Sequence, residues 1–298
     1  MKTINAPDLN IVGEAYESID EFYAVNEARE LNAAYAGNGD FSAKRKHDVT
    51  DRKEYTWQET KDDMRLGSNL FDKEFEECVK EVQKEVPSAW KAATRNRAHK
   101  DVVGQSVLVE RAMVGHPRAF SRKKPQRIKQ KTVSFFFSIS CPWYVDAHDR
   151  LKSGVILMAV CEHLERMGYQ TRILYSPDFS FGKKTRWNDK DWPSMLVQFC
   201  LKDYKTRFNL KKMQFPLASK SALFHAGCWW NHRTPVQTRC WGDGEGFSVD
   251  NDATRLEKAK EYARRNDSVY LSVPMIRGEL GMDVAKVFEY VMDSIDEM

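Results

Sequence analysis

A strand–helix–strand pattern between residues 132 and 175 constrains the fold of this chain more than any other feature. Residues 132–140 read TVSFFFSIS, an apolar run of strand length, and residues 149–167 carry apolar side chains at helical spacing. A second strand is predicted over residues 169–175. Two successive strands joined by one helix pair in parallel through a right-handed crossover. The pattern therefore predicts a parallel βαβ unit within an α/β domain.

Further elements are predicted on both sides of this unit. Strands are expected over residues 195–201 and 269–276, and an amphipathic helix with apolar residues from Val284 to Ile295 closes the chain. Towards the N-terminus, the capping-box pattern at residues 18–21 should open a helix to about residue 34. Residues 71–86 again have apolar side chains at helical spacing.

Together these elements predict an α/β fold with a Rossmann-like three-layer core and a largely helical N-terminal portion. Three regions are expected along the chain. Residues 1–90 form an acidic, mainly helical portion, residues 91–131 a basic linker or arm, and residues 132–298 the α/β core domain.

Positive charge is concentrated in the middle of the chain. Residues 91–240 hold 28 Lys and Arg against 10 Asp and Glu, whereas the segments before and after them carry net charges of −8 and −6. Five of the eight Trp lie in this middle region, with Trp90 and Trp241 at its edges. Cations neutralise phosphates and release counterions, while aromatic rings stack on unpaired bases for about 1–3 kcal/mol each. The combination predicts binding to a single-stranded nucleic acid.

Three clusters supply the candidate phosphate and base contacts. The first, the basic arm, consists of Arg118, Phe120, Arg122, Lys123, Lys124, Arg127, Lys129 and Lys131. The second consists of Lys183, Lys184, Arg186 and Trp187. The third consists of Lys202, Lys205, Arg207, Lys211 and Lys212. Because core elements separate the clusters, their recurrence favours an extended basic surface. The alternative is that the arm is a solvated loop or contacts the acidic N-terminal helices.

An adjacent tryptophan pair, Trp229 and Trp230, offers further stacking residues. Neighbouring residues on a strand face opposite sides, so one ring is expected in the core and the other exposed to a base. Around this pair lie the residue types of a zinc site, His225, Cys228, His232 and Cys240. Their spacing matches no common zinc-finger pattern, and core cysteines beside surface histidines are the favoured interpretation. No cofactor is therefore expected.

Asp178, Asp203 and Lys205 form an alternative, catalytic set. Pro177-Asp178 followed by Asp203-Tyr204-Lys205 fits the pattern of Mg²⁺-dependent nucleases, in which two carboxylates hold the metal and the lysine helps to position and activate water. Three common residue types at a loose separation also occur by chance, and a surface role is favoured. The glycine-rich run at residues 241–247 lacks the spacing of a phosphate-binding loop. The chain is therefore expected not to be an enzyme.

Segments that would direct the chain to a membrane are not evident in the sequence. No stretch approaches the roughly 20 apolar residues of a membrane span, and the first residues lack the apolar core of a secretory signal. The six cysteines are dispersed, which is typical of reduced thiols. A cytoplasmic protein without membrane contact is expected.

The end of the first predicted strand carries a local resemblance. Phe137-Ser138-Ile139-Ser140-Cys141-Pro142 lies where von Willebrand A-type domains carry Asp-x-Ser-x-Ser before a long helix. In this chain Ser138 stands in place of the Asp, and Pro142 in place of the last Ser. The resemblance implies a Rossmann-like start. It makes a degenerate protein-interaction module of this type one functional alternative.

A broader resemblance covers residues 103–118 (VGQSVLVERAMVGHPR), the strand at 132–140, the following helix and residues 168–173 (GYQTRI). These segments resemble uncharacterised proteins encoded by bacteriophages. With the basic, aromatic middle, the chain is similar to the single-stranded DNA-binding RNA polymerase cofactors of short-tailed phages that carry a virion RNA polymerase. The resemblance implies a protein that holds melted DNA and recruits a phage RNA polymerase in the host cytoplasm. A Mg²⁺-dependent nuclease remains the catalytic alternative.

Overall fold

A computed structural model of this protein describes residues 1–29, 45–46, 54–55, 57–68, 72–86, 131–141, 145–181, 193–206, 209–218, 222, 226, 230, 234 and 247–298. The described strands are β1 (Lys2–Ala6), β2 (Ile11–Tyr16), β3 (Arg45–Lys46), β4 (Glu54–Tyr55), β5 (Lys131–Ser138), β6 (Tyr169–Phe181), β7 (Ser194–Lys202), β8 (Phe247–Ser248) and β9 (Ser268–Ser272). The described helices are α1 (Ile19–Glu27), α2 (Trp57–Leu66), α3 (Asp72–Glu85), α6 (Ala147–Met167), α7 (Leu210–Ala218), the 3₁₀ turn η2 (Val249–Asn251), α9 (Ala253–Arg265), α10 (Val273–Arg277) and α11 (Val284–Asp296).

One seven-stranded sheet forms the centre of the fold. Its strand order is β1-β2-β7-β6-β5-β9, with the short β8 also paired to β6, while β3 and β4 form a separate hairpin. β5 is parallel to both β6 and β9, and β7 runs antiparallel to β6. The helix α6 connects β5 to β6, so the predicted parallel βαβ unit is confirmed.

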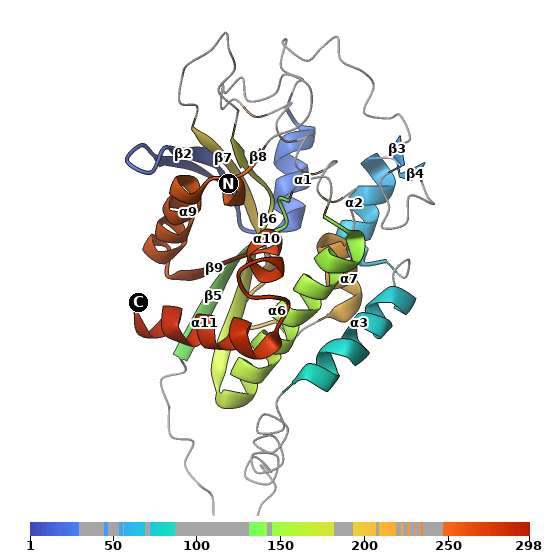
Figure 1. The fold of residues 1–298 in the computed structure, drawn as a ribbon. Coiled ribbons are helices and arrows are strands. Elements are labelled where there is room, and N and C mark those ends of the chain that lie inside the picture. The colour runs from blue at the N-terminus through green and yellow to red at the C-terminus, as the bar shows by residue number, and fades with distance from the viewer. Residues whose placement is uncertain are drawn as a thin grey trace, which may run out of the picture.

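Helices cover both faces of this sheet, as Figure 1 shows, with α9 on one side and α3 and α6 on the other. The strand β5 explains why two covering layers are needed. Val133, Phe135 and Phe137 pack into the core under α6, whereas Phe136 packs into the core under α9 and stacks on Tyr270 with ring centroids 5.6 Å apart. A strand that is apolar on both faces must be covered on both faces. The three-layer α/β class is therefore confirmed.

Both ends of α6 have local sequence signals that place the neighbouring strands. The Asp146 side chain caps its N-terminus by accepting a hydrogen bond from the His148 backbone N–H at 3.1 Å. At its C-terminus, Gly168 adopts a left-handed conformation with φ of 97°, which glycine adopts without steric cost. β6 begins at the next residue, Tyr169.

The N-terminal portion differs from its predicted structure in one respect. It is largely helical in the described residues, but β1 and β2 join the central sheet, where β2 pairs in parallel with β7. The sheet therefore incorporates the first residues of the chain. The proposed boundaries at residues 90 and 131 stay predictions, because residues 87–130 lie outside the described residues.

Two predicted elements are shorter in the structure. The strand expected over residues 269–276 ends at Ser272, whose side chain accepts a hydrogen bond from the Met275 N–H and caps α10. Pro274 in the first turn of α10 suits a helix start and removes a strand donor. The helix opened by Ser18 is described to Glu27 rather than to residue 34.

Candidate nucleic-acid interface

The basic arm and the third basic cluster reach the same edge of the sheet. Lys131 is the first residue of β5 and pairs with Tyr169, the first residue of β6. β7 runs antiparallel to β6 and ends at Lys202, opposite Ile173. The chain that enters β5 and the chain that leaves β7 therefore meet at the N-terminal ends of β5 and β6. We call this region, represented by Lys131, Tyr169, Arg172, Tyr204 and Lys205, the amino edge.

Two cation–aromatic pairs stand at the amino edge. The Lys131 ammonium lies 5.5 Å from the centroid of the Tyr169 ring, and the Arg172 guanidinium carbon lies 5.9 Å from the centroid of the Tyr204 ring. All four side chains are exposed or half-buried. Each pair presents a positive charge and a flat ring together, which are the groups that bind a phosphate and stack on a base.

A tight turn after β7 carries Tyr204 and Lys205. The Thr206 backbone N–H donates to the Asp203 carbonyl at 3.1 Å, and the Thr206 hydroxyl donates to the same carbonyl at 2.8 Å. Lys205 is exposed at this turn. The Asp203 carboxylate lies 4.0 Å from Arg172 Nε and partly offsets the positive charge of the edge.

Lys202 is not a surface cation, although its sequence context predicts one. Its Nζ donates to the Thr171 carbonyl and contacts Glu165 Oε1, each at 2.7 Å, and its side chain is 1% exposed. The Thr171 hydroxyl donates to the same Glu165 oxygen at 2.6 Å. Lys202 therefore joins β7 to α6 within the fold and is not available to a phosphate. In the rest of this cluster, Lys205 and Lys212 are exposed, and the side chains of Arg207 and Lys211 lie outside the described residues.

The remaining predicted contacts lie outside the described residues. These are Arg118, Phe120, Arg122, Lys123, Lys124, Arg127, Lys129, Lys183, Lys184, Arg186, Trp187 and Trp229. The second cluster follows Phe181, which ends β6 twelve residues after Tyr169, a separation of about 40 Å along the strand. The clusters are therefore attached at two opposite edges of the sheet, and a single continuous basic surface stays a prediction.

Trp230 is a core residue, and the interpretation of its ring as a base-stacking platform is wrong. Ala222, Ala226 and Trp230 are helical, four residues apart and fully buried. The Trp230 indole N–H donates to Glu14 Oε2 at 2.6 Å. A ring with no exposed face cannot stack on a base. Of the tryptophan pair, only Trp229 remains a candidate.

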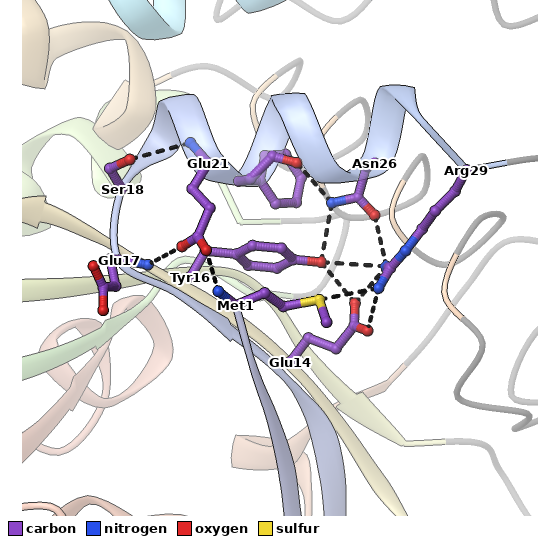
Figure 2. A network of polar contacts seen from close by, with 9 residues as sticks. Met1, Glu14, Tyr16, Glu17, Ser18, Glu21, Asn26 and Arg29 are labelled. Carbon is purple, nitrogen blue, oxygen red and sulfur yellow. Dashed lines mark hydrogen bonds and ion pairs between the residues drawn. The ribbon is translucent and has the colours of Figure 1, made fainter.

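Glu14 on β2 is the centre of a buried polar network (Figure 2). The same carboxylate accepts the hydrogen bond from the Trp230 indole N–H. Arg29 donates two hydrogen bonds to the Glu14 carboxylate, each 2.7 Å long, and the Tyr16 hydroxyl donates one at 2.6 Å. Asn26 links Tyr16 and Arg29 from α1. Burial raises the pKa of Glu14, but the hydrogen bonds from Arg29, Tyr16 and Trp230 outweigh it and hold the pKa below its ordinary value. The network anchors α1 to the sheet.

The candidate nuclease residues do not come together. Asp178 is buried on β6 and pairs with Val197 of β7, six residues before Asp203. The two carboxylates are therefore about 20 Å apart along the strands, too far to share a metal ion. Lys205 lies with Asp203 at the amino edge. The alternative assignment of Asp178, Asp203 and Lys205 to one catalytic centre is therefore wrong.

Candidate zinc ligands His225, Cys228, His232 and Cys240 lie outside the described residues. Where side chains are described, no group of three or more His, Cys, Asp or Glu could hold a metal ion. None of the described helices is long and apolar enough to cross a membrane.

Three members of the amino edge, Tyr169, Arg172 and Tyr204, are not predicted from the sequence. Tyr169 and Arg172 lie outside the charge clusters, and only the strand register brings them to Lys131 and Tyr204. Tyr204 adjoins Lys205 in the sequence but carries no charge of its own. A tyrosine close to a basic residue, Tyr169 with Arg172 at the start of β6 and Tyr204 with Lys205 after β7, is the signal that could have drawn attention to them.

The fold and this edge define a three-layer α/β protein with an aromatic, positively charged end of its sheet. Residues 2–288 match the model of a family described as a domain of unknown function (DUF7192), and the chain belongs to this family. No curated protein and no solved structure matches the chain.

Proposed function

We propose that this protein binds single-stranded DNA at the amino edge of its sheet. The observation that carries the proposal is the meeting of two basic segments there, since Lys131 ends the basic arm and Lys205 belongs to a cluster some 70 residues later in the chain. The cations of Lys131 and Arg172 stand beside the half-buried rings of Tyr169 and Tyr204.

The chemistry of binding follows from these groups. Lys131, Arg172 and Lys205 pair with phosphates, and the tyrosine rings accept stacked bases. Stacking requires an exposed base face, which a duplex does not offer, so the surface prefers single strands. The basic arm that precedes Lys131 adds phosphate contacts without base specificity. No bond is made or broken in this scheme, and the protein acts without catalysis or a cofactor.

The biological role within this proposal is that of a phage transcription cofactor, which holds melted DNA and recruits an RNA polymerase. This part rests on the resemblance of residues 103–118 and 132–173 to phage proteins. The acidic N-terminal portion, with a net charge of −8 over residues 1–90, has the charge to dock a basic surface of the polymerase or to compete with DNA for the amino edge.

Neutralising the amino edge should weaken DNA binding in a salt-dependent way. The triple variant Lys131→Gln, Arg172→Gln, Lys205→Gln loses three phosphate contacts. Each contact on a single strand contributes about 0.7 to the slope of log binding constant against log salt concentration, so the slope should become about 2 less steep. Fluorescence anisotropy with a labelled oligonucleotide across a salt series measures this slope.

The matched control removes the same charge elsewhere. Lys80, Lys84 and Lys286 are exposed lysines on α3 and α11, away from the amino edge, and their triple Gln variant should retain the wild-type slope. If the two triple variants had the same salt-dependence slope, the amino edge would not be the DNA-binding surface.

A further inference from the structure

A second candidate site lies at the opposite end of β5, where the polypeptide leaves the sheet. β5 has parallel neighbours on both sides, reached by α6 on one face of the sheet and by α9 on the other. The carboxyl end of such a strand is a topological switch point, the place where open α/β sheets bind ligands. In this chain the loop after β5 leads directly to the N-terminus of α6.

Arg150, in the first turns of α6, is the distinctive residue at this point. It is 2% exposed, and its Nη1 donates to the Val145 carbonyl at 2.8 Å. Because Val145 precedes the helix cap, this bond turns the guanidinium back towards the N-terminus of α6. The Nε and Nη2 atoms of Arg150 are buried and have no hydrogen-bond partner among the residues that the structure describes.

Among the described residues Arg150 forms no ion pair within 4.0 Å, and the two acidic side chains nearest to it in the sequence, Asp146 and Asp149, have other partners. Asp146 caps the helix through the His148 N–H, and the Asp149 carboxylate accepts a hydrogen bond from Arg277 Nε at 2.6 Å. A buried guanidinium is normally paired with an anion. The two unpaired donors of Arg150 therefore indicate that an anion binds there.

The other groups around Arg150 favour an anion as well. The N-terminus of the 21-residue helix α6 carries a partial positive charge and backbone N–H groups that lack acceptors within the helix. Burial raises the pKa of the Tyr175 phenol on β6 and the charge of Arg150 lowers it, so the guanidinium lies near this strand. The Tyr175 hydroxyl itself donates to the Pro216 carbonyl at 2.6 Å.

We propose that Arg150 and the N-terminus of α6 form a binding site for a phosphate group. The planar guanidinium offers two parallel donors, a geometry that matches two oxygens of a phosphate, and the helix terminus adds favourable electrostatics. The phosphate is either the free inorganic ion or the phosphate of a nucleotide. The site is independent of the proposed DNA interface, because seven residues of β5, about 23 Å, separate it from Lys131.

Isothermal titration calorimetry tests this site with sodium phosphate at an ionic strength held constant with sodium chloride. Wild-type protein is expected to bind one phosphate per chain, and Arg150→Met should raise the dissociation constant by about 10- to 100-fold. Parallel titrations with thymidine 5′-monophosphate and with thymidine distinguish the free ion from a nucleotide phosphate. Binding of neither phosphate compound by wild-type protein would overturn the proposal.

Control variants distinguish phosphate binding at Arg150 from a non-specific attraction of phosphate to positive charge. Arg166→Gln removes the same charge from the exposed, C-terminal end of α6, where Arg166 pairs with Glu162, and it should leave the affinity unchanged. If Arg150→Met does not fold, Arg150→Lys, which lacks the planar fork, should still lose about tenfold. Phosphate binding that is equally tight in the folded Arg150 variant and in wild-type protein would contradict the assignment.

Discussion

Replacing Glu14 with alanine is expected to lower the free energy of unfolding by about 3–5 kcal/mol, because a buried ion pair is broken. The substitution leaves the Arg29 guanidinium without its two carboxylate bonds and the Trp230 indole N–H without an acceptor. Urea denaturation followed by circular dichroism measures the loss. Glu17→Ala, in an exposed residue three positions away, is the matched control and should change stability by less than about 0.5 kcal/mol. Similar losses for the two variants would show that the network contributes little.

The same carboxylate predicts a dependence of stability on pH. Because the pKa of Glu14 in the folded protein lies below its ordinary value, Glu14 stabilises the fold at neutral pH. This contribution is fully present above the unfolded-state pKa of about 4.3 and is lost as the pH falls through the folded pKa. Wild-type protein should therefore lose more stability than the Glu14→Ala variant when urea denaturation is repeated at pH 3.

Gly13→Ala is expected to be the other severely destabilising substitution, with a loss of at least about 3 kcal/mol. Gly13 on β2 pairs with Leu196 on β7, and a Cβ atom at Gly13 would lie 1.8 Å from the Leu196 carbonyl oxygen. The obstacle is backbone in the middle of the sheet, so no side-chain rotation relieves it. β2 would have to separate from β7, and Glu14 would move with it.

Gly281→Ala is the control for this substitution. It adds the same methyl group where no atom lies within 4 Å, at a φ of 62°. Its cost is that of a left-handed backbone alone, about 1–2 kcal/mol. Urea denaturation of both variants measures the difference, and a Gly13→Ala loss no larger than that of Gly281→Ala would contradict the close packing of β2 on β7.

The central fold could be predicted because its elements depend on local patterns. The apolar run of β5, the helical spacing of α6 and the strand that follows are short-range features, and both strands are buried on two faces. The sequence pattern does not predict β1 and β2, because they are short and only partly apolar. β2 also contains Gly13, a residue that strands usually disfavour but that this close packing requires.

The candidate site was harder to predict, since its parts depend on long-range partners. Lys202 resembles its exposed neighbour Lys205 in the sequence, and only the position of Glu165 on α6 buries its charge. Trp230 meets Glu14, which lies 216 residues earlier in the chain. Charge composition suggested a ligand class for the middle region, but the register of β5, β6 and β7 was needed to locate the amino edge.

The most direct test of the central claim is the affinity of the wild-type chain for labelled single-stranded and double-stranded oligonucleotides of the same sequence. Fluorescence anisotropy across a salt series gives both affinities and their salt dependence. We expect tighter binding to the single strand, with an affinity that falls steeply as salt rises. Equal affinity for the two forms, or no binding to either at low salt, would contradict the proposed function.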